Sequence, residues 1–157
     1  MKPKVYLETT IPSLLVARPS RDLIQAADQQ TTLEWWETRR GKFQLFVSEL
    51  VLEESARGDR ALAAKRLAAI AQCRVLEATD AARSLTVDFL GAGLIPSKAA
   101  ADAAHIALAA VHGMDFLLTW NCRHIANAMT VDRVRDLCAR RGFPPPVICT
   151  PYELMLP

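Results

Sequence analysis

Carboxylate and amide side chains stand at four places where this 157-residue chain changes from one kind of pattern to another. Glu8 follows the apolar run VYL, and Asn121 follows LLTW. Glu53 and Glu54 lie early in a helical pattern after FQLFV, and Asp102 interrupts the small, apolar stretch AAADAAHIALAA. Charged side chains are rarely buried without a partner, so such an aspartate needs a cation, a cap-like contact or solvent. Cation binding or backbone capping is the chemistry these residues could do.

Each position also has a purely structural interpretation. Glu8 could cap backbone N–H groups in the TTIPS turn that follows it, and Asn121 could be an ordinary turn residue. Glu53 and Glu54 could both lie on a helix surface, and only one of them can point toward a sheet because adjacent helical residues differ by ~100° in direction. The aspartate of the apolar helix could form a solvated pair with His105, three residues further on.

The elements that must position these residues alternate between short apolar runs and longer helical stretches. Strands are predicted at residues 4–7, 43–47, 73–78, 115–120 and 146–150. Helices are predicted at residues 21–40, 49–57, 59–72, 79–91, 97–113 and 130–141, with Asp59, Thr79 and Ser97 as caps and Gly113 as a stop. This alternation favours one α/β domain over residues 1–157, with a parallel sheet covered on both faces. Ligands bind outside the carboxyl ends of such strands, which is where Glu8 and Asn121 fall.

Composition and missing motifs exclude several classes of function. Hydrophobic residues make up 51% and charged residues 23% of the chain, and the formal net charge is +2, an ordinary globular balance. No apolar run is long enough for a membrane span and no signal-peptide core is evident, so we expect no membrane partner and a cytoplasmic location. The sequence contains no GxGxxG, phosphate-loop, GxSxG or HExxH motif. The four cysteines lack metal-ligand spacing, which predicts reduced, mostly buried thiols.

Four stretches in order, VYLETT, VSELVLEES, ADAAHIALA and LLTWNCRHI, resemble the PIN-domain family, in particular its VapC-like toxin group. The resemblance spans nearly the whole chain. It implies a three-layer α/β/α sandwich with a central parallel sheet of four to five strands. It also implies a ribonuclease that uses Mg²⁺ or Mn²⁺ held by a cluster of acidic side chains, cytoplasmic and belonging to a toxin–antitoxin pair.

Matching the motifs residue by residue gives the catalytic positions implied by the resemblance, which are Glu8, Glu54, Asp102 and Asn121. The resemblance implies that the three carboxylates hold the metal, with Glu53 as the alternative to Glu54. Asn121 would orient a water or a second ion, and Thr9 and Thr119 would donate hydrogen bonds to the carboxylates. Thr10 falls on the amide-type position of the first motif.

The resemblance also implies an RNA substrate, an antitoxin protein and a homodimer as partners. Arg123 and Arg18 are the cations predicted to bind RNA. Trp120 could stack on a base or belong to the core or an interface. Trp35 and Trp36 could supply a surface for a partner, or could equally be intramolecular core.

Two of the four catalytic positions depart from the family pattern, because Glu8 and Asn121 stand where aspartate is usual. Glu8 keeps the charge but extends the reach by one methylene, and Asn121 keeps an oxygen but loses the charge. The alternative hypothesis is therefore a catalytically weakened PIN-like module that binds RNA or protein. A third hypothesis, a Mg²⁺-dependent hydrolase of small molecules, needs an aspartate nucleophile after the first strand, where Glu8 fits poorly.

Overall fold

A computed structural model describes residues 1–155 of the chain. Five short strands form one sheet in which every neighbouring pair is parallel. The strands are β1 (Lys4–Leu7), β2 (Gln44–Ser48), β3 (Arg74–Leu76), β4 (Phe116–Leu118) and β5 (Val147–Cys149). Each overlaps one of the five apolar runs, so the prediction of an α/β fold with a parallel sheet is confirmed.

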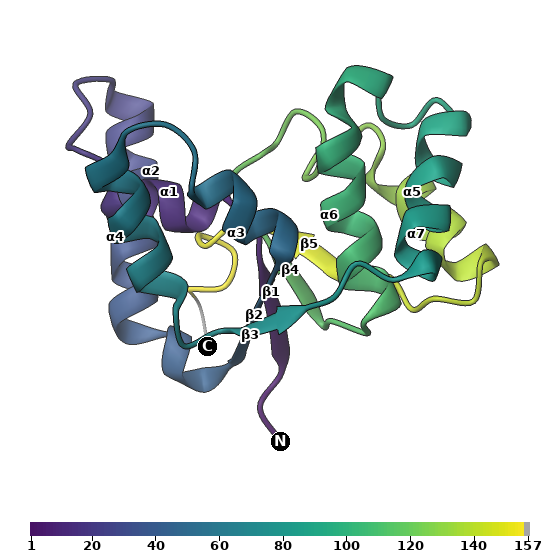
Figure 1. The fold of residues 1–157 in the computed structure, drawn as a ribbon, viewed down its shortest axis with the longest axis horizontal. Coiled ribbons are helices and arrows are strands. Elements are labelled where there is room, and N and C mark those ends of the chain that lie inside the picture. The colour runs from purple at the N-terminus through teal and green to yellow at the C-terminus, as the bar shows by residue number, and fades with distance from the viewer. Residues whose placement is uncertain (156–157) are drawn as a thin grey trace.

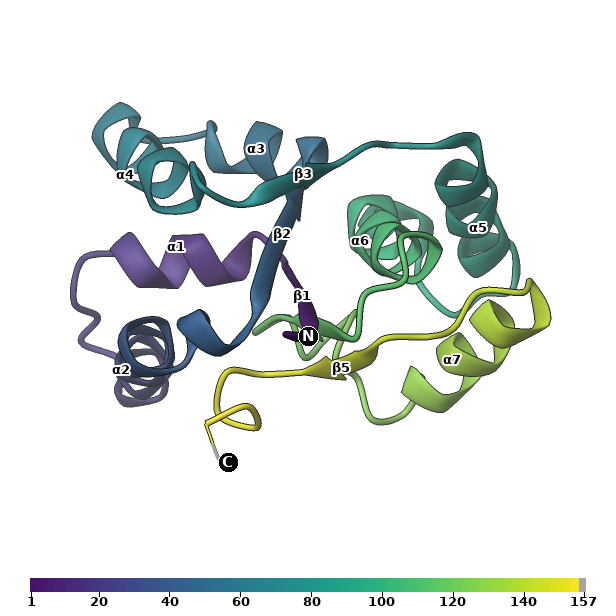
Figure 2. The same cartoon turned by 90° about the horizontal axis from the view of Figure 1, so that it is seen from below.

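Helices cover both faces of the sheet and make three layers. Seen from below, α1, α2 and α4 lie on one side of the strands and α5, α6 and α7 on the other (Figures 1 and 2). The helices are α1 (Thr10–Val16), α2 (Leu23–Thr38), α3 (Glu49–Ser55), α4 (Arg60–Ile70), α5 (Asp80–Gly91), α6 (Ala100–Val111) and α7 (Val131–Arg140), with 3₁₀ turns η1 (Arg40–Lys42) and η2 (Ser97–Ala99). Within residues 1–155, none of the helices combines the length and the apolar character that crossing a bilayer requires.

Capping side chains explain where several of these helices begin. Asp22, Ser48, Asp59 and Thr79 each accept a hydrogen bond from the backbone N–H three residues further on. Each such bond satisfies one of the N–H groups that a helix leaves free at its start, and its loss costs about 1 kcal/mol. Asp59 and Thr79 are the caps that the sequence predicts at these positions.

Two local predictions at helix starts are wrong. The TTIPS stretch is not a simple turn but the beginning of α1, and Pro12 is tolerated because a proline in the first turn removes an N–H that has no partner there. Ser97 does not cap α6; it begins η2, and α6 starts at Ala100 without a capping side chain. Gly113 does close α6 as predicted, with φ of 68° in the left-handed region that favours glycine.

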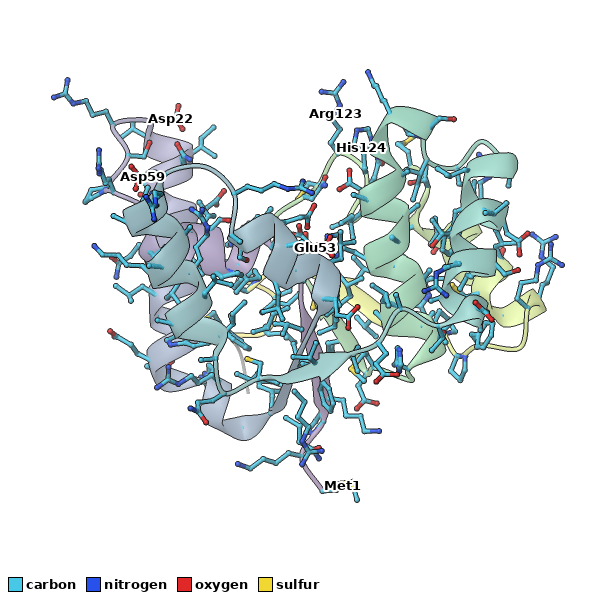
Figure 3. All side chains as sticks on the ribbon, in the orientation of Figure 1. Met1, Asp22, Glu53, Asp59, Arg123 and His124 are labelled. Carbon is cyan, nitrogen blue, oxygen red and sulfur yellow. The ribbon has the colours of Figure 1, made fainter. Side chains whose placement is uncertain are left out.

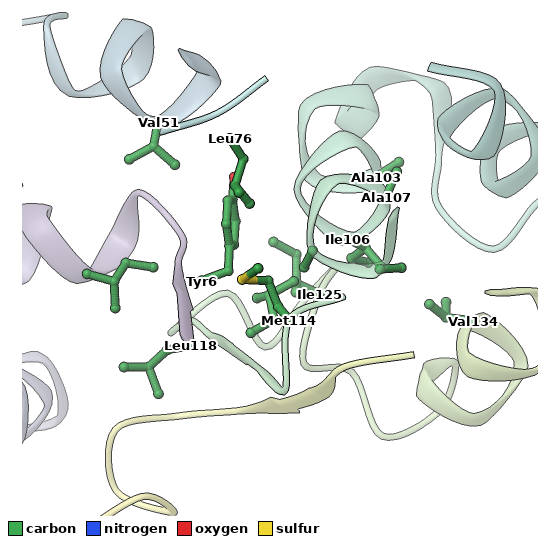
Figure 4. Close-up of a cluster of buried hydrophobic side chains, with 14 of the residues drawn as sticks. Tyr6, Val51, Leu76, Ala103, Ile106, Ala107, Met114, Leu118, Ile125 and Val134 are labelled. Atoms are coloured by element: carbon green, nitrogen blue, oxygen red, sulfur yellow. The ribbon is translucent and has the colours of Figure 1, made fainter. Parts of the chain in front are cut away.

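The core lies between the sheet and the helices on its two sides. Figure 4 shows part of it, where Tyr6 lies toward the helix that carries Ile106, and Leu118 lies on the opposite side of the strands. Ala103 and Ala107 on α6 are fully buried, and α6 packs closely against α5. Their small side chains let the helix approach its neighbours, which is the close packing that the alanine-rich sequence predicts.

Trp35 and Trp36 have different environments on α2. Trp35 is 0% exposed and its ring stacks on Phe43 with the ring centroids 5.7 Å apart. Trp36 is partly exposed, and the guanidinium of Arg40 lies over its ring at 4.8 Å. Trp35 is therefore intramolecular core, the second of the two roles considered for this pair.

Candidate functional site

The strand order β3-β2-β1-β4-β5 reverses direction between β1 and β4. From β1 the chain moves outward through β2 to β3, and then returns through α5 and α6 to place β4 on the other side of β1 (Figure 1). Connections that leave two adjacent strands in opposite directions open a crevice at the carboxyl ends of those strands, where ligands bind in this class of fold. Leu7 pairs with Leu118, so Glu8 and Thr119 follow the two strands side by side at this edge.

Glu8 is held at this edge through one oxygen of its carboxylate. The residue is 4% exposed, and its Oε1 accepts hydrogen bonds from Thr10 Oγ1 (2.5 Å), Thr119 Oγ1 (2.7 Å) and the Thr10 backbone N–H (3.2 Å). The hydrogen bond from the Thr10 backbone N–H is the capping contact that the structural interpretation of Glu8 predicts. Among the described residues no hydrogen bond reaches Oε2, which leaves that oxygen free to bind a ligand.

Glu54 is held in the same manner on α3. Its Oε1 accepts a hydrogen bond from Thr9 Oγ1 (2.5 Å) and lies 2.7 Å from Nε2 of His105. Burial by itself raises the pKa of Glu54, but the hydrogen bonds from His105 and Thr9, together with the electrostatic attraction of His105 and Arg57, hold the pKa below its usual range. The carboxylate is therefore charged at neutral pH. Thr9 and Thr10 are adjacent in sequence, yet each donates to a different carboxylate.

Glu53 lies outside this group of side chains. It is exposed (Figure 3). It lines a separate depression between α3, α5 and α6, together with Arg83 and Leu108. Of the two neighbouring glutamates, Glu54 is the one whose carboxylate bonds to the β1 end and to α6.

A buried chain of hydrogen bonds that the sequence did not predict stands behind Glu54. Nδ1 of His105 lies 2.7 Å from the Tyr6 hydroxyl, which lies 2.8 Å from Ser48 Oγ, and all three side chains are buried. Burial raises the pKa of Tyr6, so its hydroxyl keeps its proton. The available signal was the placement of a tyrosine in an apolar strand and a histidine in an alanine-rich helix, because each needs a hydrogen-bond partner once buried.

Asp102 carries a charge that has no partner in the described part of the chain. It lies in the first turn of α6 and is partly exposed, and no hydrogen bond or ion pair joins its carboxylate to residues 1–155. The solvated pair with His105 is not formed, because that imidazole bonds to Glu54 and Tyr6. Since α6 leads into the start of β4, its first turn lies at the end of the molecule where the strands finish (Figure 1).

Asn121 has a structural role in the turn after β4. Its Oδ1 accepts a hydrogen bond from the His124 backbone N–H at 3.0 Å, the usual contact of an asparagine in a turn. Its own backbone N–H donates to Thr119 Oγ1 at 2.9 Å, and Thr119 in turn donates to Glu8. Asn121 is thereby connected to Glu8 through one intervening hydroxyl.

Among the described residues, the two arginines predicted to bind RNA make no ion pair with these carboxylates. Arg123 is exposed on the loop after Asn121 (Figure 3), and Arg18 is exposed in the connection between α1 and α2. Trp120 is partly buried, and its Nε1 donates to Thr32 on α2 at 2.8 Å. The indole is therefore anchored to the α1–α2 layer.

The chemistry of these side chains fits a hard divalent cation, which takes carboxylate and water oxygens. Glu8 and Glu54 each keep one oxygen without a hydrogen bond, and Asp102 keeps both. Within residues 1–155, however, no group of three or more His, Cys, Asp or Glu side chains is already gathered where it could hold a metal ion. Thr9 and His105 both bond to Glu54, and among the described residues no hydrogen bond joins Glu54 to Glu8 or Asp102, so an ion would have to draw the three carboxylates together.

Comparison with known proteins supports the fold. The sequence matches no protein-family model and no curated protein. Among solved structures, the chain is similar to one in the crystal structure of VapBC2 from Rickettsia felis bound to a DNA fragment from their promoter. The TM-score is 0.53 and the identity 13%, over 93% of this chain and 97% of that one. The likeness confirms the predicted PIN-like three-layer fold; at this identity it shows the fold alone.

Proposed function

We propose that this chain is an endoribonuclease that hydrolyses RNA with Mg²⁺ or Mn²⁺ held by Glu8, Glu54 and Asp102. One observation carries the proposal. At the switch point of a PIN-like sheet, two carboxylates from different elements are each fixed through Oε1 while Oε2 has no hydrogen bond. Such an arrangement keeps negative charge oriented at the place where this class of fold binds ligands.

Glu8, Glu54 and Asp102 would hold a divalent ion there, and the ion would supply activation of a water and neutralisation of phosphate charge. The protein side chains have the remaining roles. Thr119 and Thr10 orient Glu8, and Thr9 orients Glu54, as donors behind ligands commonly do. Asn121 contributes through its hydrogen bond to Thr119, and Arg123 and Arg18 bind phosphates of the RNA by charge.

We also propose that the chain is the toxin of a toxin–antitoxin pair, works in the cytoplasm and forms a homodimer. Support for a protein partner comes from the similar solved structure, which is a VapBC2 assembly on DNA. The sequence resemblance to VapC-like toxins points the same way, with an antitoxin as the partner.

The proposal is tested by incubating the purified chain with RNA and Mn²⁺. Asp102→Ala should lower the cleavage rate at least about 10-fold, because it removes a ligand carboxylate. Asp80→Ala is the matched control, since Asp80 is also in the first turn of a helix but is exposed and paired only with Arg83 on the surface. Cleavage that persists unchanged in Asp102→Ala or in EDTA contradicts the mechanism.

The second candidate is a PIN-like module that binds RNA or protein without cutting it. Two observations favour it: the Asn121 side-chain oxygen is already used in its turn, and the carboxylates do not form a ready-made metal group within residues 1–155. Binding of Mn²⁺ to the folded state raises the melting temperature. A Mn²⁺-dependent rise that disappears in Asp102→Ala supports the nuclease, and no rise in the wild-type chain supports the binding module.

A further inference from the structure

We infer that His105 is a positioning residue for Glu54, and that the buried chain Ser48–Tyr6–His105 fixes the Glu54 carboxylate in the orientation needed to bind an ion. The part of this inference that concerns metal rests on the proposed function. The part that concerns orientation stands on the hydrogen bonds themselves.

The imidazole of His105 is held on both of its nitrogens. Nδ1 is 2.7 Å from the Tyr6 hydroxyl and Nε2 is 2.7 Å from Glu54 Oε1, and the ring is 0% exposed. Tyr6 is fixed in turn by Ser48 Oγ, which also accepts a hydrogen bond from the Val51 backbone N–H at the start of α3. Because Ser48, Tyr6 and His105 each have a buried hydrogen-bond partner, the imidazole ring cannot turn without breaking a hydrogen bond.

The Glu54 side chain gains its orientation from these hydrogen-bonded side chains. Its side chain is partly exposed and has several rotatable bonds, so it would sample many conformations without fixed donors. His105 comes from α6 and Thr9 from the end of β1, and both bond to the same oxygen. Two donors on one oxygen leave the other oxygen unbonded and the carboxylate in one pose.

The same hydrogen bond sets the spacing between two candidate metal ligands. Among the described residues, His105 to Glu54 is the only side-chain hydrogen bond that joins α3 to α6. Asp102 lies one turn before His105 on α6, on the same face of the helix. His105 therefore couples the position of the α3 carboxylate to that of the α6 carboxylate.

Stability alone does not account for this chain of polar groups. Well-packed apolar side chains often replace a buried polar network at no loss of stability. A role in orientation predicts a specific effect on Glu54 that a core substitution of similar size does not produce.

The test compares His105→Leu, His105→Gln and the neighbouring core variant Ile106→Val. Mn²⁺ affinity is measured by titration on folded protein, and the order of the Glu54 side chain is measured by NMR without metal. His105→Leu should weaken Mn²⁺ binding about 10-fold or more and leave the Glu54 side chain mobile. Glutamine keeps an N–H donor, so His105→Gln should restore part of the Mn²⁺ affinity and part of the order of the Glu54 side chain. Ile106→Val should change neither the affinity nor the order. Tyr6→Phe, which removes only the hydroxyl that holds Nδ1, serves as the second variant if His105→Leu does not fold.

The two measurements separate the two claims. If the wild-type chain binds no Mn²⁺, the proposed function fails, and the NMR measurement still decides whether His105 orders Glu54. A Glu54 side chain that is equally ordered in the wild type and in His105→Leu overturns the inference. So does Mn²⁺ binding that stays within twofold of the wild type in His105→Leu.

Discussion

Glu54→Gln is expected to lower Mn²⁺-dependent RNA cleavage by more than about 100-fold, above the range typical of residues that only orient a ligand. Glutamine preserves the size of the side chain and removes the charge that a divalent ion requires. Glu54 is the glutamate that bonds to Thr9 and His105 at the strand ends. Single-turnover cleavage of a labelled RNA at saturating Mn²⁺ measures the effect.

Glu53→Gln provides the matched control for this experiment. Glu53 is the adjacent residue of the same helix, but it is exposed and lies in a different depression of the surface. Its substitution should leave the cleavage rate within twofold of the wild type. Equal losses in the two variants, with circular dichroism showing both folded, would mean that the difference between the two glutamates has no bearing on activity.

Trp35→Ala is expected to destabilise the folded chain by about 3–5 kcal/mol, the range found when a large aromatic side chain is removed from a core. Trp35 is 0% exposed and stacks on Phe43, so the substitution leaves a cavity beneath α2. A loss of this size is a large fraction of the stability of a typical domain. Urea unfolding followed by circular dichroism measures it.

Trp36→Ala separates the core role from a role in a partner interface. Trp36 is partly exposed, so its removal should cost much less stability than removal of Trp35. Size-exclusion chromatography of both variants shows whether either tryptophan holds two copies together. If Trp35→Ala unfolded at the urea concentration of the wild type, the tryptophan would not be packed as the structure has it.

The sequence predicted the sheet well because its strands are short apolar runs that a parallel arrangement buries on both faces. It also placed Glu8 at the carboxyl end of β1, which is where the strand order makes a crevice. The helix at Thr10–Val16 was missed, because the TTIPS stretch was interpreted as a turn although a proline in a first turn does not oppose a helix.

The hydrogen bonds that connect His105 to Glu54 and Tyr6 could not be predicted from the sequence pattern. His105 lies 51 residues from Glu54 and 99 from Tyr6, and a helical or strand period says nothing about such distant pairs. The choice between Glu53 and Glu54 likewise depends on how α3 is rotated against the sheet. That rotation is set by packing of side chains such as Val51, which is fully buried, and not by local propensity.

Diffraction from crystals of the chain soaked in Mn²⁺, recorded at the manganese absorption edge, is the most direct measurement of where a cation binds. We predict an anomalous peak at the carboxyl ends of β1 and β4, in contact with Glu8, Glu54 and Asp102. If manganese ions bind only elsewhere and contact none of these three carboxylates, the result contradicts the proposal that the carboxylates form the metal centre of a ribonuclease.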